Sequence, residues 1–181
     1  MLGLDAKQKV KHLSKGQNGK LALLLALGHH PEVVILDDPT LGLDPIARKE
    51  FLRYVIGLLQ SNEVTVFFSS HLLYEIEPVA DSVAILKDGK IIKANKTFQL
   101  REDVRRFILN KTEDLDAKGI PGLLDVSMNG ERMTVTVDQY AEAKKKLTQM
   151  AEVSVVREVA LNLDEIFEAY VVGNRGERVQ A

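Results

Sequence analysis

Apolar runs alternate with helical patterns along the first half of the chain and predict an α/β arrangement. The run from Val33 to Leu36, bounded by Pro31 and Asp37, is typical of a parallel strand that is covered on both faces. A second run, from Val64 to Phe68, predicts another buried strand. Apolar periodicity around these strands predicts helices at residues 17–27, 45–60 and 72–79.

The pattern changes after Asp103, where short strands and turns predict a small α+β module. Its predicted strands cover residues 106–109, 123–128, 132–137 and 153–157, and its helix covers residues 139–150. Asn129-Gly130 is typical of a tight hairpin turn between two of these strands. A further hairpin is predicted before the module, from residues 82–86 and 90–93 around an Asp88-Gly89 turn.

The composition permits a folded core and argues against several classes of protein. The chain has 181 residues, of which 45% are apolar, so it is long enough for one domain or slightly more. A net charge of −2 gives no electrostatic reason to expect a nucleic-acid partner, and the lack of cysteine excludes disulfides and thiolate sites. No apolar run approaches the ~20 residues of a membrane-spanning helix, and the amino terminus lacks a secretory pattern. We therefore expect a soluble, cytoplasmic chain.

Acidic and hydroxyl side chains follow the two predicted strands directly. Asp37 and Asp38 end the first strand, whereas Ser69, Ser70 and His71 end the second. Because ligands of open α/β sheets bind at the carboxyl ends of the strands, the two acids are candidates for metal binding or water activation. The alternative is an ordinary Asp-Asp-Pro turn in which either acid caps the next helix.

Two predicted helices begin with residues that suit both a structural and a binding role. Ser14 is a helix N-cap that, together with the free amides of the first turn, can also bind an anion. Asp44 is a second N-cap, with Pro45 in the first helical position. The residues alone leave both interpretations open.

Four short segments stand in a fixed order along the chain: Leu13–Gln17, Val33–Asp38, Leu41–Asp44 and His71. Together they resemble the signature motif, Walker B strand, D-loop and switch histidine of the ATP-binding cassette family of transporter ATPases. The resemblance continues more loosely to about Asp103. Beyond this point the chain is similar to the extension of multidrug and polysaccharide-export cassettes, which closes with a helix like Leu163 to Phe167.

The resemblance implies an ATP site shared between two subunits, with Mg²⁺ as the accompanying ion. The signature residues would bind the γ-phosphate of an ATP held by the opposing subunit; they are Ser14, Lys15, Gly16 and Gln17. Lys15 stands where the family most often has glycine. Gly16 keeps the second glycine, which permits a positive φ and a close approach to phosphate.

The resemblance also assigns roles at the acidic strand ends. Asp37 would orient Mg²⁺, Asp38 would polarise the attacking water and His71 would contact the γ-phosphate. The family usually has glutamate at the position of Asp38, so this carboxylate is one methylene shorter and slow turnover is expected. Asp44 would lie in the D-loop, which crosses the dimer interface and links the two ATP sites.

The family places its P-loop upstream of the signature motif, and this sequence contains no Gly-x-x-x-x-Gly-Lys-Ser/Thr. The chain is therefore interpreted as a partial P-loop NTPase core that lacks the P-loop part, residues 1–103, followed by the α+β extension, residues 104–181. Three explanations are considered for the missing part. They are a start codon assigned too late, a gene fragment, and a short protein that complements another subunit.

The implied function is that of the ATP-hydrolysing subunit of a transporter, with export as the expected direction. Its partners would be transmembrane permease subunits and a second cassette ATPase subunit, which would hold it at the cytoplasmic face of the membrane. The isolated chain is expected to be inactive. Two alternatives stay open: a regulatory module that lends its signature face to another subunit, and a soluble cassette ATPase of DNA repair or translation.

Overall fold

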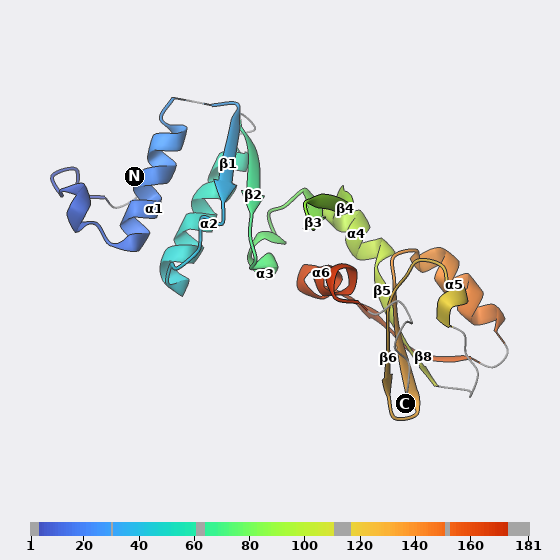
Figure 1. The fold of residues 1–181 in the computed structure, drawn as a ribbon. Coiled ribbons are helices and arrows are strands. Elements are labelled where there is room, and N and C mark those ends of the chain that lie inside the picture. The colour runs from blue at the N-terminus through green and yellow to red at the C-terminus, as the bar shows by residue number, and fades with distance from the viewer. Residues whose placement is uncertain (1–3, 30, 61–63, 111–116, 151–152, 174–181) are drawn as a thin grey trace. The chain divides into compact units, whose positions relative to one another are not determined.

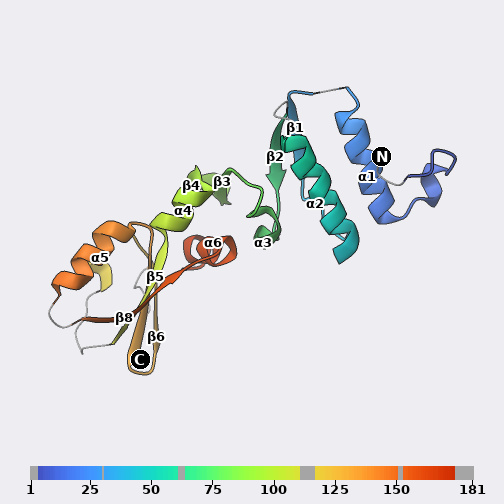
Figure 2. The ribbon, with the colours of Figure 1, turned by 180° about the vertical axis from the view of Figure 1, so that it is seen from behind.

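The computed structural model describes residues 4–29, 31–60, 64–110, 117–150 and 153–173. The chain divides into two compact units, residues 1–79 and residues 80–181, which run from blue to green and from green to red in Figures 1 and 2. No helix in these described ranges is both long enough and apolar enough to cross a bilayer. The domain boundary expected at residue 103 from the family resemblance stays a prediction.

The first unit is an α/β arrangement around a pair of parallel strands. Its elements are η1 (Val10–His12), α1 (Lys15–Leu27), β1 (Val33–Asp37), α2 (Pro45–Gln60), β2 (Thr65–Ser69) and α3 (Leu73–Ile76). The strands pair in parallel from Val33 opposite Thr65 to Asp37 opposite Ser69, with α2 as the connection between them. The predicted α/β class is confirmed, although the helix expected at residues 72–79 is limited to α3.

The core of this unit lies between the two longer helices and one face of the strand pair. Its buried residues are Leu23, Leu43, Phe51 and Val55, and Leu36, Val66 and Phe68 pack against them from the strands. Both views show α2 alongside β1 and β2 (Figures 1 and 2).

The opposite face of the strand pair is exposed, which corrects the prediction of strands buried on both sides. Val33, Ile35 and Phe67 are 53%, 77% and 62% exposed. The register places Ile35 beside Phe67, so these side chains belong to one face. A continuous aliphatic run shows that a strand could be buried on both faces. In the described part of this unit, however, other residues cover only one face of the strand pair.

The second unit is an α+β module with an antiparallel sheet. It contains a hairpin, β3 (Ser82–Lys87) and β4 (Lys90–Lys96), followed by α4 (Thr97–Asp103), β5 (Arg105–Asn110), η2 (Ala117–Gly119), β6 (Leu123–Asn129), β7 (Arg132–Val137), α5 (Tyr140–Gln149), β8 (Ser154–Ala160) and α6 (Leu163–Val171). The four-stranded sheet has the order β6-β7-β5-β8. Side chains of α5 such as Ala143 and Leu147 join Phe107, Val126 and Val135 of the strands in its core.

Both predicted hairpins are confirmed, but α4 is missing from the prediction. Its N-cap, Lys96, makes no side-chain capping bond, so the usual start signal is absent from this helix. Thr97 and Leu100 are its buried residues, too few to establish a helical period in the sequence.

Candidate functional site

The two predicted acids meet a serine from the neighbouring strand. Asp37 is the last residue of β1, and the parallel register places Ser69 opposite it. The Ser69 hydroxyl donates to Asp37 Oδ1 at 2.5 Å and accepts from the Asp38 amide at 2.8 Å. The Asp38 amide also lies 3.1 Å from the Ser69 carbonyl oxygen. One serine therefore contacts both acidic residues.

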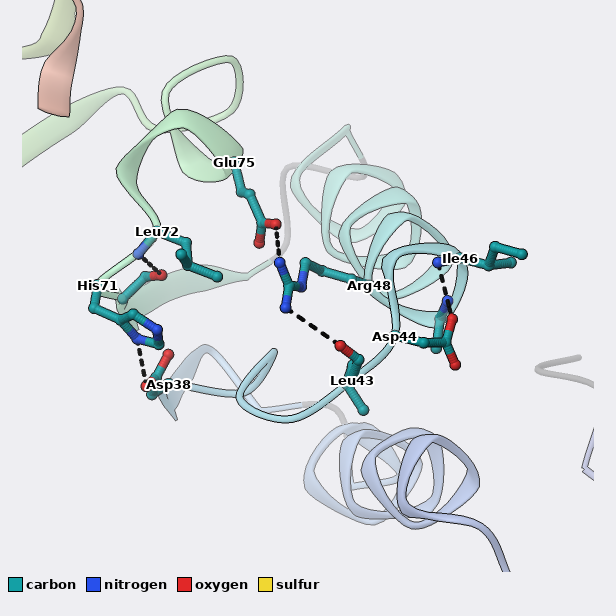
Figure 3. A network of polar contacts seen from close by, with 10 residues as sticks. Asp38, Leu43, Asp44, Ile46, Arg48, His71, Leu72 and Glu75 are labelled. Carbon is teal, nitrogen blue, oxygen red and sulfur yellow. Dashed lines mark hydrogen bonds and ion pairs between the residues drawn. The ribbon is translucent and has the colours of Figure 1, made fainter.

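Asp38 turns the chain away from β1 and contacts the predicted switch histidine. Its φ is +41°, a left-handed value that is uncommon for residues other than glycine. Asp38 Oδ2 lies 2.8 Å from His71 Nδ1 (Figure 3), and the side chains are 26% and 56% exposed. Asp38 Oδ1 is buried and has no hydrogen-bond partner among the described residues. The structure thus brings Asp37, Asp38 and His71 together.

The donor set at this edge fits Mg²⁺ if phosphate or water completes the coordination. No cluster of three or more His, Cys, Asp or Glu suited to a metal occurs in the described part of the chain. Mg²⁺ is commonly held by one or two carboxylates together with phosphate oxygens and waters. Because Ser69 bonds Asp37 Oδ1, the other oxygen of Asp37 remains for such an ion.

The signature segment forms a capping box at the start of α1. The Gln17 amide donates to the Ser14 hydroxyl oxygen at 3.2 Å, and the Ser14 amide donates to Gln17 Oε1 at 2.8 Å. Ser14 is therefore the predicted N-cap. Its O–H remains available as a donor, because no described residue accepts a hydrogen bond from it.

Gly16 differs from the expectation of a positive φ. It lies inside α1 and is not among the glycines with positive φ. A Cβ placed on Gly16 would lie 3.4 Å from the Ala47 Cβ in α2, which is close to the limit of an ordinary contact. The absence of a side chain at Gly16 therefore allows α1 to pack closely against α2.

Lys15 and the predicted D-loop lie side by side. Gly42 has a φ of +72°, and a Cβ placed on it would come 2.0 Å from Lys15 Nζ. The Lys15 side chain thus crosses directly over Gly42, although the residue as a whole is exposed. A side chain at position 42 would displace this cation from the loop.

Asp44 ends the same loop and caps α2. Its Oδ1 accepts hydrogen bonds from the amides of Ile46 at 2.9 Å and Ala47 at 3.0 Å (Figure 3). The bond from Ala47 holds the pKa of the Asp44 carboxyl below its usual value, and Ile46 and Arg48 act in the same direction. Asp44 therefore caps α2 as predicted. A contact of Asp44 with a second subunit would be an additional role.

Sequence reasoning missed an ion pair between α2 and α3. Arg48 donates through Nη1 to Glu75 Oε1 at 2.9 Å and through Nη2 to the Leu43 carbonyl at 3.2 Å (Figure 3). The bond with Glu75 raises the pKa of Arg48. The Glu75 side chain is only 8% exposed. This pair ties the loop that ends at Asp44 to the helix that follows His71, and no local sequence signal links residues so far apart.

The predicted site residues thus form two groups in the first unit. Asp37, Asp38 and His71 share contacts at the strand ends, whereas the signature segment reaches the loop at Gly42 through Lys15. Within the described residues, no hydrogen bond or ion pair joins the two groups directly.

The chain is similar to one described protein family and to several named ATP-binding proteins. Residues 3–77 match the family described as "AAA domain, putative AbiEii toxin, Type IV TA system". The bacitracin transport ATP-binding protein BcrA of Bacillus licheniformis is 38% identical over 104 residues, which are 58% of this chain and 34% of that protein. The ABC transporter ATP-binding protein YtrB of Bacillus subtilis is 26% identical over 172 residues, covering 93% of this chain and 58% of that protein.

A solved structure is also similar to part of the chain. It is a post-hydrolysis dimer of an ATP-binding cassette bound to ADP and Pi, with 24% identity and a TM-score of 0.48. The match covers 53% of this chain and 42% of that one. The chain thus spans less than two thirds of the length of the relatives it matches here.

Proposed function

We propose that the chain belongs to the ATP-binding cassette family and that it forms part of the ATP-hydrolysing subunit of a membrane transporter. The observation that carries the proposal is the contact between Asp38 and His71 at the ends of two parallel strands, where Asp37 is also held. Two acids and an imidazole at this edge suit the hydrolysis of a phosphoanhydride.

Each residue at the strand ends has a distinct role in this proposal. Asp37 would hold Mg²⁺ through the oxygen that Ser69 does not occupy. The ion, when bound, would neutralise charge on the phosphates of ATP. Asp38 would accept a hydrogen bond from the attacking water, and His71 would orient that carboxylate and contact the γ-phosphate.

The signature segment would act on a nucleotide held by a second subunit. The free O–H of Ser14 would donate to the γ-phosphate while its oxygen keeps the cap of α1. Lys15 would add a cation beside this anion from its position over Gly42, and Asp44 would link this loop to the opposing site. Gln17 contributes by holding Ser14 in place, since its side chain accepts from the Ser14 amide.

The assembly would place this chain against a second cassette subunit and transmembrane permease subunits at the cytoplasmic face of a membrane. Export is the proposed direction of transport, in keeping with the resemblance of the carboxy-terminal extension. An alternative function is a module without its own hydrolysis that lends the signature face to another subunit. The contact between Asp38 and His71 favours the hydrolytic role, because a module of that kind has no need of it.

Calorimetric titration of the purified chain with ATP and Mg²⁺ tests the proposal. The chain is measured alone and then mixed with a P-loop-bearing cassette from the same source. We expect no binding by the chain alone and tighter nucleotide binding by the mixture than by the P-loop partner alone. Unchanged binding by the mixture would contradict the proposed role of the signature segment. If ATP hydrolysis by the mixture is lost when His71 is replaced, the chain acts as a hydrolytic subunit and not as a module without hydrolysis of its own.

A further inference from the structure

Ser69 occupies the central position among the groups at the strand ends. Three contacts meet at this residue: its hydroxyl donates to Asp37, its hydroxyl oxygen accepts from the Asp38 amide, and its carbonyl lies near the same amide. The two hydroxyl contacts, at 2.5 and 2.8 Å, use the donor and one acceptor of a single side chain. The side chain therefore fixes the Asp37 carboxylate and the Asp38 backbone at once.

The backbone that Ser69 holds is strained. A φ of +41° at Asp38 costs conformational energy for a residue with a Cβ, and such a value persists where surrounding contacts enforce it. The two bonds to the Asp38 amide are contacts of this kind, because they hold the peptide between Asp37 and Asp38. This backbone turn directs the Asp38 side chain toward His71.

The same bond also limits how the Asp37 carboxylate can turn toward a cation. Rotation of the carboxylate is restricted once the Ser69 hydroxyl holds Oδ1. The remaining oxygen, through which Asp37 would hold Mg²⁺, then keeps a fixed direction.

We propose that Ser69 is a positioning residue for the hydrolytic site, which sets the direction of the Asp37 carboxylate and the turn at Asp38. The link to metal use rests on the proposed function, whereas the link to the turn does not. Ser69 acts through its neighbours: it orients the residue that holds the ion and the residue that activates water.

The adjacent serine provides a matched control. Ser70 differs in its contacts, because its hydroxyl accepts from the Leu72 amide at 3.0 Å and serves the turn into α3. Ser70→Ala therefore removes a hydroxyl one residue away without touching Asp37 or Asp38. Ser69→Thr keeps the hydroxyl and is the conservative variant.

The first experiment measures amide hydrogen exchange at Asp38 in the full chain without nucleotide. In Ser69→Ala we expect exchange at this amide to be several-fold to about tenfold faster, the range that one lost hydrogen bond gives. Ser69→Thr and Ser70→Ala should exchange at this amide like the parent chain. Unchanged exchange in Ser69→Ala would overturn the proposal, whatever the chain does with ATP.

The second experiment measures ATP hydrolysis against Mg²⁺ concentration in the mixture with a P-loop-bearing cassette. Ser69→Ala should lower kcat by about tenfold or more and raise the Mg²⁺ concentration at half-maximal rate, because small displacements of reacting groups are costly. Rescue by Ser69→Thr supports positioning, whereas a lower melting temperature with normal Mg²⁺ dependence would assign Ser69 a purely structural role. If the parent mixture hydrolyses no ATP, the proposed function fails, and exchange at Asp38 still decides whether Ser69 holds the turn.

Discussion

Two capping boxes, one in each unit of the chain, allow the structural and binding roles of Ser14 to be separated. Ser14 caps α1 together with Gln17, and Asn162 caps α6 together with Glu165 by the same reciprocal pair of bonds. Ser14→Ala removes a cap at the proposed nucleotide site. Asn162→Ala removes a cap in the other unit, where no nucleotide contact is proposed, and serves as the control.

The expected losses of stability follow from the lengths of the capping bonds. The bond from the Gln17 amide to Ser14 is 3.2 Å long, and the bond from the Glu165 amide to Asn162 is 2.9 Å long. Loss of a cap costs about 0.5–2 kcal/mol, so we expect about 0.5–1 kcal/mol for Ser14→Ala and about 1–2 kcal/mol for Asn162→Ala. For units of this size, 1 kcal/mol corresponds to roughly 4–8 °C in melting temperature.

Nucleotide affinity should change in the opposite order from stability, with the larger loss in Ser14→Ala and none in Asn162→Ala. A hydrogen bond to a charged group contributes about 1.5–3 kcal/mol, so Ser14→Ala should weaken nucleotide binding by the mixed subunits at least tenfold. Asn162→Ala should leave that affinity unchanged although it destabilises the fold more. Thermal unfolding and calorimetric titration of each variant provide the two measurements, with Ser14→Thr as a variant that keeps the hydroxyl. Equal affinity for Ser14→Ala and the parent chain would show that Ser14 is a helix cap and no more.

Four further predictions concern other features of the chain. Asp38→Glu should leave the rate of ATP hydrolysis in the mixture unchanged or raise it, and a large loss would count against Asp38 as the residue that activates water. Gly122→Ala should lower the free energy of unfolding by at least about 2 kcal/mol, because its φ is +65° and a Cβ would lie 2.7 Å from the Gln139 amide nitrogen. Gly130→Ala, at a φ of +60° with no atom within 4 Å of the added Cβ, should cost about 1 kcal/mol in the same denaturant titration. The hydrogen bond from Tyr140 lowers the pKa of Glu158, with Lys144 second, so this carboxylate stabilises the fold above its unfolded pKa and that contribution is lost as the pH falls. Tyr140→Phe should therefore reduce the loss of melting temperature between about pH 5 and pH 3, and an unchanged acid dependence would contradict this assignment.

Local chemistry made the starts and turns of the first unit predictable. Ser14 and Asp44 each satisfy amides within three residues of themselves, so their cap roles could be inferred from neighbouring positions in the sequence. The Asp88-Gly89 turn was predictable for the same reason, since both residues have positive φ in the hairpin. Elements of this kind depend on short stretches of chain.

Contacts between distant residues could not be inferred in this way. The sequence placed Ser69 near the acidic edge, but its two bonds depend on the parallel register that aligns it with Asp37. The pair of Arg48 and Glu75 depends in the same manner on how α2 and α3 meet. The prediction that both faces of the strands are buried was wrong for a related reason. Residue type shows only that a strand could be buried, whereas its exposure depends on which other elements pack against it.

The strand pair of the first unit also bears on the behaviour of the chain in solution. Among the described strands, β1 and β2 pair with each other alone, so each presents one edge of unpaired backbone groups. The exposed side chains of Val33, Ile35 and Phe67 lie between these edges. Open edges beside an apolar face are templates for pairing between molecules. We therefore expect protein concentration, more than temperature, to determine how long a purified sample stays free of aggregates.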